Sequence, residues 1–577
     1  MAEAKTARAA RHGVAETAAV GLPMLCVIAA VAAALTILVQ GFVFGWSNNL
    51  FQVPFVEGWF DDPAFANDAF VQSLRFFASW VWSLAGLMAP ATGTEQAFLI
   101  LHIASRFLMM LTAALLVREV GPRGVAGIAV AMLALALADG LHRTSRVGGH
   151  DLYYWFFSHS GVTWPVILLS LLALIRGHVV AAVAANGVVF GINGFVAATH
   201  GVGLLTGALG LWPKERAGRW RLVRQWLLGL VLALLVGAPT LVWVWQMLAT
   251  QPPPAAGFDG RDFLWSYWPE HWWVSFAPWR DRLWAVLNAV AGLLALLLLG
   301  KRARVLLWAY CGYAAVFALA GLLPHVTHSL TILNLHPLRI GSGLVTFLAT
   351  LAVVAATARA LLEEQGGAAR RWLAAIAMLA IAWGSLKAMP VAVVSLGALL
   401  AMRRARPAWL GWVPDWAPAA AVALLAALVP LRLAEFAETR AARTRDAAAQ
   451  REIGDWLRER TPAEAMVLVP AAATPPHSHN IQVWARRRFW VDWKRGGAVQ
   501  WSPHYHAEWS SRLREVQALR GVGDDIAYAC ANGIGWLVET PERLRGARPP
   551  RLAFRTERYA VVEVAPGCAG VSGARPG

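Results

Sequence analysis

The chain has 577 residues, of which 58% are hydrophobic and only 15% are charged, and its formal net charge is +17. Its mean hydropathy of +0.50 lies well outside the range of soluble domains and excludes an ordinary water-soluble enzyme. Apolar runs of about 20 residues, long enough to cross a bilayer, recur from Ala18 almost to Leu433. The sequence therefore predicts a mainly α-helical, polytopic membrane protein.

The first 40 residues combine a basic head with a long apolar core. That core is too long for a signal peptide and has no persuasive cleavage site at its end, so we expect an uncleaved first span.

Lys and Arg are distributed unevenly between alternate loops. With the N-terminus placed inside, the loops on the inner side hold twenty of them and the opposite loops hold eight. This positive-inside pattern predicts about thirteen spans in an inner (plasma) membrane and a C-terminal part outside the cytoplasm. It also accounts for the net charge without a nucleic-acid partner. Segments 178–211 and 372–402 are each short for two spans and could instead form broken or re-entrant helices.

The first predicted external loop, residues 41–96, is acidic within a basic protein, since it holds five acids and one base, Arg75. One hypothesis is that Asp61 and Asp68 cap short interfacial helices, because the Asp-Pro pair at 62–63 is typical of a helix start. The other is that these carboxylates act as a general base or hold a divalent cation, Mg²⁺ or Mn²⁺, beside the lipid surface.

Three segments resemble a known family. Residues 45–70 read GWSNNLFQVPFVEGWFDDPAFANDAF, and the later segments 453–470 and 486–513 read IGDWLRERTPAEAMVLVP and RRRFWVDWKRGGAVQWSPHYHAEWSSRL. The first is similar to the first external loop of bacterial multi-spanning GT-C type glycosyltransferases, and the other two resemble the C-terminal segment of a largely uncharacterised branch of that group.

The resemblance implies a sugar donor carried on a polyprenyl phosphate or diphosphate, and an acidic residue in the first external loop that deprotonates the acceptor. Transferred to this sequence, Asp62 is the first candidate base and Asp68 the second, while Asp61 is a neighbour that tunes the local charge. The loop lacks the Asp-Glu or Asp-x-Asp pair of well-studied members.

Other predicted outer loops carry candidate substrate ligands. In 143–161, Arg143 and Arg146 could pair with a lipid phosphate, with His150 and Asp151 beside them, although a snorkelling span end also explains the two arginines.

The Trp-rich loop 258–273 contains Asp262, Glu270 and His271, a mixture suited to holding sugars or to an interfacial aromatic belt. Arg339 lies at the mouth of a later span, where a charge is costly unless it is paired, and we expect it to face the donor phosphate.

Residues 436–577 read as a small soluble α/β domain, in contrast to the membrane domain 1–435. Short apolar runs alternate with an amphipathic segment, and Cys530 and Cys568 could form a disulfide in an oxidising compartment. The sequence assigns no chemistry to Asp492, Trp493 and Lys494, which lie in the family-like stretch.

These features together predict an inverting membrane glycosyltransferase whose partners are membrane lipids and a polyprenyl-phosphate-linked sugar donor. Its acceptor would be an extracytoplasmic glycan, lipid or protein. Two alternatives stay open: a transporter or flippase for lipid-linked glycans, and a non-catalytic partner in envelope assembly.

Overall fold

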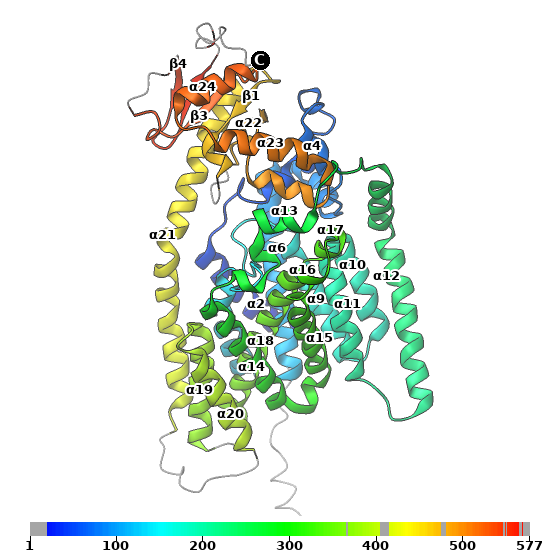
Figure 1. Cartoon of the computed structure of the whole chain (residues 1–577). Coiled ribbons are helices and arrows are strands. Elements are labelled where there is room, and N and C mark those ends of the chain that lie inside the picture. The colour runs from blue at the N-terminus through cyan, green and yellow to red at the C-terminus, as the bar shows by residue number, and fades with distance from the viewer. Residues whose placement is uncertain are drawn as a thin grey trace, which may run out of the picture.

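The computed structural model describes residues 20–364, 367–403, 415–474, 480–545, 549, 551–564 and 568. The chain forms a body of helices that run roughly side by side, and a smaller mixed domain lies at one end of that body (Figure 1). The basic N-terminal head, which contributes to the predicted sidedness, lies outside the described residues.

The helical body consists mainly of apolar helices, some joined by short connections and others by long loops. They are α2 (Leu22–Gln40), α6 (Thr94–Val120), α7 (Val125–Leu137), α9 (His159–Ile175), α10 (Val179–Ile192), α11 (Gly194–Leu209), α12 (Arg216–Thr250), α14 (Trp279–Leu299), α15 (Arg304–Ala320), α18 (Pro337–Leu362), α19 (Ala368–Trp383), α20 (Met389–Ala401) and α21 (Ala417–Arg460). Within the described ranges, six helical stretches are long and apolar enough to cross a membrane. The protein is therefore a multi-pass membrane protein, and the count of thirteen spans and their sidedness stay predictions.

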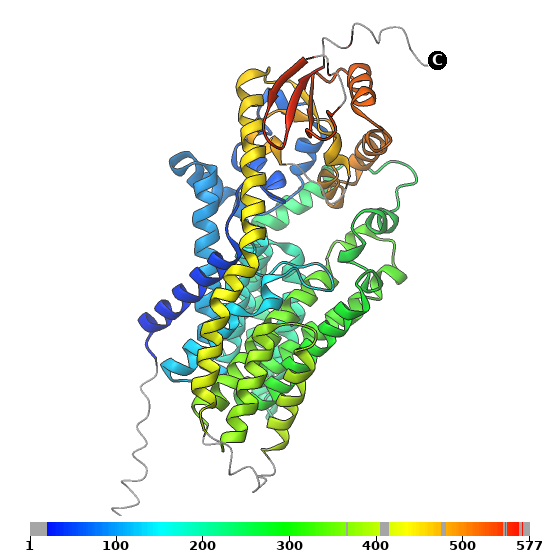
Figure 2. The same ribbon diagram turned by 90° about the vertical axis from the view of Figure 1, so that its left-hand side faces the viewer.

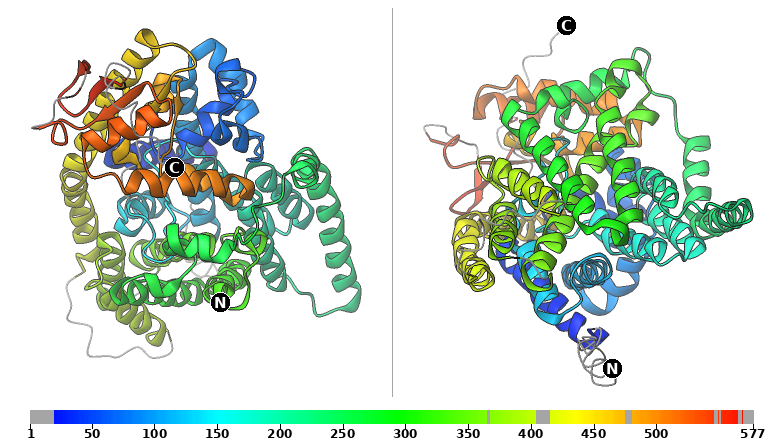
Figure 3. Two further views of the ribbon diagram at one scale, coloured as in Figure 1. Left: turned by 45° about the horizontal axis from the view of Figure 1, so that its top comes forward. Right: turned by 90° about the horizontal axis from the view of Figure 1, so that it is seen from below.

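Helix α18 is the buried axis of this body. Every residue from 340 to 358 is buried, and α7, α14, α15 and α19 pack around the helix. Small residues allow this close packing: a Cβ on Gly292 of α14 would lie 2.6 Å from the Cβ of Ala349. By contrast, α12 stands at the edge of the body and exposes much of its apolar surface, as expected for a helix that faces lipid (Figure 3).

Short helices cover the end of the body that carries the mixed domain. They are α3 (Asn49–Val56), η1 (Pro63–Phe65), α4 (Ala69–Leu74), α5 (Val81–Thr92), α8 (Asp139–His142), α13 (Gly260–Tyr267), η2 (Pro269–His271), η3 (Val274–Phe276), α16 (Leu323–Val326) and α17 (Leu330–Leu333), whereas η4 (Gly300–Ala303) joins α14 to α15. Asp62 and Asp68 are N-caps, since their carboxylates accept hydrogen bonds from the backbone N–H of Ala64 and Val71. Asp62, rather than the expected Asp61, caps η1.

The C-terminal domain is a five-stranded sheet with helices packed on it. The strands are β1 (Met466–Leu468), β2 (Arg488–Phe489), β3 (Trp536–Glu539), β4 (Arg551–Arg555) and β5 (Ala560–Glu563), in the order β2-β1-β3-β5-β4. β1 pairs in parallel with β2 and β3, and β5 pairs antiparallel with β3 and β4.

The remaining elements of this domain are η6 (Pro470–Ala473), α22 (Ile481–Ala485), η7 (Lys494–Gln500), η8 (Pro503–Tyr505), α23 (His506–Gln517) and α24 (Val522–Ala531). A disulfide joins Cys530 to Cys568. Both the expected α/β character of this part and the expected cysteine pairing are confirmed.

Helix α21 connects the two parts without a break, because it runs from the body up to the sheet (Figure 2). The domain boundary expected at residue 435 falls inside this helix and stays a prediction.

A buried arginine anchors α21 to the body. The guanidinium of Arg432 lies 3.1 Å from the carboxylate of Asp139 and donates to the carbonyls of Ala382 and Trp383 at the end of α19. Glu435 also pairs with it. A buried charge is tolerated here because both an acid and the negative end of a helix compensate it.

Replacement of this arginine should destabilise the body. We expect Arg432→Met to lower the free energy of unfolding by about 3 kcal/mol, because the change takes a buried ionic partner from Asp139 and leaves carbonyls unpaired. Thermal unfolding of the purified protein in detergent measures the effect. Arg545→Met, which removes an exposed partner of Glu542, is the control and should shift stability by less than about 0.5 kcal/mol. Equal unfolding temperatures for the two variants would contradict the anchoring role.

Candidate functional site

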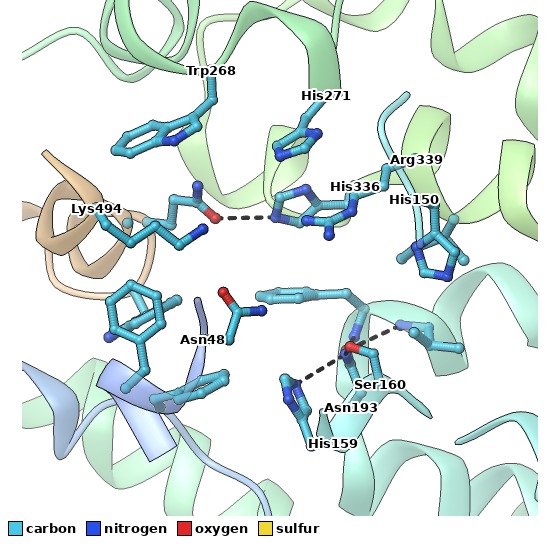
Figure 4. A pocket seen from close by; sticks show the side chains of 18 residues that line it. Asn48, His150, His159, Ser160, Asn193, Trp268, His271, His336, Arg339 and Lys494 are labelled. Carbon is cyan, nitrogen blue, oxygen red and sulfur yellow. Dashed lines mark hydrogen bonds between the residues drawn. The ribbon is translucent and has the colours of Figure 1, made fainter. Parts of the chain in front are cut away.

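A pocket of about 120 Å³ lies between the end of the helical body and the C-terminal domain (Figure 4). Aromatic rings form part of its wall: Phe51, Phe77, Phe195, Trp268 and Trp501. Its basic and imidazole groups are His150, His159, His271, His336, Arg339 and Lys494. Asn48, Ser160, Asn193 and Gln500 add neutral polar groups. Among the described residues that line this pocket, none is an aspartate or a glutamate.

The C-terminal domain enters the pocket through η7, which is held on the body by hydrogen bonds. The side-chain amide of Asn334 donates to the carbonyl of Gln500, and that of Gln251 donates to the carbonyl of Trp501 at 2.6 Å. His336 Nε2 lies 3.1 Å from the side-chain oxygen of Gln500. These contacts place Lys494, the first residue of η7, in the pocket wall.

The body contributes the first turn of α18. His336, the N-cap, has the left-handed backbone conformation (φ 47°), and Pro337 begins the helix. The loop containing Gly148 packs directly on this turn, since a Cβ there would lie 2.8 Å from the Cα of Arg339. Gly148 has φ +81°, so both its backbone and its surroundings require glycine. Arg339 is thereby fixed at the positive end of a long helix dipole.

Several buried polar atoms in the pocket wall have no hydrogen-bond partner within the described part of the chain. They are His150 Nδ1, His159 Nδ1, His336 Nδ1, Arg339 Nε and Trp501 Nε1. Buried polar groups in folded proteins are nearly always hydrogen-bonded, so this cluster points to a polar ligand or to solvent in the pocket.

The charge of the pocket comes from Arg339 and Lys494. Burial and, to a smaller extent, the neighbouring Arg339 lower the pKa of Lys494 to about 8, although Asp492, Asp151 and Glu270 oppose the shift. At pH 7 the ammonium is therefore still mostly protonated. Burial also holds the pKa of His150 at about 3 and that of His271 well below its usual value, so these rings are neutral. A cavity with two cations and neutral donors suits an anion such as phosphate.

The structure brings some of the sequence-predicted residues together here. Arg339, His150 and His271 line the pocket. Glu270 lies beside it, with Oε1 3.8 Å from Nε2 of His271, and burial raises its pKa although Arg339 and Lys494 counteract the rise. Asp151 accepts a hydrogen bond of 2.6 Å from Thr144.

The other predicted acids lie elsewhere. Asp61 and Asp62 are exposed, Asp68 is buried as the cap of α4, and Asp262 lies exposed in the first turn of α13. None of these four lines the pocket. The two predicted phosphate-binding arginines have acidic partners in the chain: Arg143 pairs with Asp139 and Glu435, and Arg146 with Asp281 at 2.9 Å. Roles for these residues in catalysis or substrate binding stay predictions.

Sequence reasoning missed Lys494, His336, His159 and Asn48 as site residues. Lys494 follows Asp492 and Trp493 in segment 486–513. The family resemblance of that segment is the one sequence signal that pointed to this lysine. Its role depends on how the domain docks on the body, which no local pattern encodes.

A divalent cation does not fit this pocket. Mg²⁺ and Mn²⁺ prefer carboxylate oxygens, whereas the lining offers two cations and neutral groups. Across the described ranges, no group of three or more His, Cys, Asp or Glu residues could hold a metal ion.

Comparisons with known proteins give limited matches. A domain of unknown function (DUF6798) matches residues 448–516, which include η7 and Lys494. No curated protein sequence matches the chain. The structure is similar to the single-particle cryo-EM structure of arabinosyltransferase EmbB from Mycobacterium smegmatis, with 13% sequence identity and a TM-score of 0.39. The likeness covers 72% of this chain and 40% of that one, and at this size it does not extend that protein's activity to this chain.

Anion binding should depend on the protonation of Lys494. Below its pKa of about 8 the ammonium attracts a phosphate, and as the pH rises through that value the charge is lost. We expect the affinity for a prenyl phosphate, which is already a dianion above pH 7, to fall roughly tenfold between pH 7 and pH 10. Equilibrium binding to the full-length protein in lipid nanodiscs measures it.

Two variants serve as comparison. Lys494→Arg keeps its charge to high pH and should bind equally across this range. Lys387→Arg, the same change at an exposed position outside the pocket, should keep the parent's pH dependence. If the affinity of Lys494→Arg falls with rising pH as that of the parent does, a group other than Lys494 causes the pH dependence.

Proposed function

We propose that this protein is a membrane glycosyltransferase that transfers a sugar from a polyprenyl-phosphate-linked donor to an extracytoplasmic glycan, lipid or protein. The observation that carries this proposal is the placement of Arg339 and Lys494 in one partly aromatic pocket at the end of an apolar helical body. A lipid-linked donor needs this combination, because its tail stays in the bilayer while its phosphate and sugar reach the membrane surface.

The two cations would stabilise the leaving group. In an inverting transfer, the acceptor oxygen forms a bond to the anomeric carbon while the bond from that carbon to the phosphate oxygen breaks. The electron pair leaves with the lipid phosphate, whose growing negative charge Arg339 and Lys494 would neutralise. The acceptor proton goes to a general base.

The aromatic walls would hold the sugar. Phe77 stacks on Trp501 with ring centroids 4.5 Å apart, and Trp268 lines another part of the pocket. Apolar ring faces pack on sugar carbons, and the amide of Asn48 could bond to a sugar hydroxyl.

Glu270 is the best-supported general base in this proposal. It lies next to His271 of the pocket wall, and its raised pKa brings its basicity closer to neutral pH. The candidates inferred from the family resemblance, Asp62 and Asp68, accept helix-cap hydrogen bonds from the backbone N–H of Ala64 and Val71, and they stay as alternatives.

A second candidate is a protein that binds a lipid-linked sugar without transferring it. One observation favours it: among the described residues, the lining itself contains no carboxylate.

Sugar transfer in membranes distinguishes these possibilities. With radiolabelled sugars on a pool of polyprenyl phosphates, we expect the parent chain to form product. Arg339→Met should slow transfer about 100-fold, because it removes a donor to the leaving group. Glu270→Gln should slow it by a similar factor through loss of the base.

Matched acid-to-amide variants complete this experiment. Asp62→Asn, Asp68→Asn and the exposed control Glu542→Gln should transfer like the parent. If Asp62→Asn or Asp68→Asn abolishes transfer at normal expression while Glu270→Gln does not, the base lies in the first loop. Absence of product with every donor would favour the binding protein.

A further inference from the structure

We propose that the pocket binds its phosphate without a metal ion, because a guanidinium from the helical body and an ammonium from the C-terminal domain together supply the positive charge. This inference rests on the proposed function, since it takes the ligand of the pocket to be the phosphate of a lipid-linked donor.

The surroundings of the pocket leave no good ligand set for Mg²⁺ or Mn²⁺. Such ions need several oxygen ligands, and the acids that act electrostatically on Lys494, namely Asp492, Asp151 and Glu270, all lie outside the lining. Asp151 already accepts a hydrogen bond from Thr144. A divalent ion would also meet the repulsion of two fixed cations at low dielectric.

The imidazoles do not change this conclusion. His336 Nε2 lies 3.1 Å from the side-chain oxygen of Gln500, and His271 Nδ1 lies 3.2 Å from the carbonyl of Gly148. A nitrogen next to a carbonyl oxygen carries the proton, and the other nitrogen of each neutral ring is then an acceptor. Imidazole nitrogens suit Zn²⁺ or Cu²⁺ better than Mg²⁺ and Mn²⁺, so these rings do not supply the missing oxygen ligands.

The fixed charge matches the chemistry of the leaving group. A sugar linked to a prenyl phosphate is a phosphodiester with one negative charge, and the prenyl phosphate that departs is a dianion above its second pKa. Arg339 and Lys494 together carry two positive charges at neutral pH. Within the described chain, the Lys494 ammonium has no hydrogen bond or ion pair, although it lies 6.0 Å from the ring of Phe51. It is therefore free to meet the phosphate.

The two cations come from different parts of the chain. Arg339 belongs to α18, the buried axis of the body, whereas Lys494 belongs to η7 of the C-terminal domain. The contacts of Asn334 and Gln251 with η7 bring the second cation to the first. The phosphate site is thus complete only while the domain is docked. The Lys494 ammonium of the domain supplies positive charge that a metal ion supplies in other phosphate sites.

The test is binding of a prenyl phosphate to the full-length protein in nanodiscs, in EDTA and again with added Mg²⁺ or Mn²⁺. We expect equal affinity in all three conditions. Arg339→Met and Lys494→Met should each lower the affinity roughly tenfold or more, and Lys494→Arg should retain it. The corresponding prenol, which lacks the phosphate, should bind weakly to every variant. Binding that disappears in EDTA and returns with Mg²⁺ would overturn the proposal.

A second measurement needs no variant. Phosphorus NMR of the bound prenyl phosphate should show no paramagnetic broadening at Mn²⁺ concentrations that broaden a metal-bound phosphate, and strong broadening would place an ion beside the ligand and overturn the proposal. Metal-independent binding without sugar transfer from any donor would refute the proposed function alone. Sugar transfer with metal-dependent binding would refute the metal-free site alone.

Discussion

The docking of η7 on the end of the helical body is the contact on which the candidate site depends. It brings Lys494 into a buried pocket that already contains Arg339, although two like charges at low dielectric repel each other. Burial, and after it the neighbouring Arg339, lower the pKa of Lys494. A chain keeps such an arrangement when a ligand of opposite charge offsets it, and for that reason the pocket is better explained by a bound anion than by packing.

The rest of the fold holds this contact in place. Helix α18 is enclosed on all sides, so Arg339 in its first turn cannot shift without disturbing the body. On the other side, α21 runs unbroken from the body to the sheet, and Arg432 fixes its position against α8 and α19. The helical body and the C-terminal domain, which form the two walls of the pocket, are therefore connected both by the contacts of η7 and by helix α21.

The sequence predicted the membrane body, the small α/β domain and the pairing of Cys530 with Cys568, because hydropathy and cysteine placement are local signals. It also singled out Arg339, because a charge at the end of an apolar span is conspicuous. It could not predict Lys494, whose role arises from the docking of two parts far apart in sequence. Asp62 and Asp68 of the first loop are candidate bases in the sequence because acids cluster there. The same residue types also form helix caps, and both residues cap helices in the structure.

The most direct test of the account is a cryo-EM structure of the protein in nanodiscs with a sugar-linked prenyl phosphate. We expect phosphate density in contact with both Arg339 and Lys494, with the sugar against the aromatic wall that contains Trp268. Phosphate density at another place, such as beside Arg143 and Arg146, with an unchanged pocket between body and domain, would contradict it.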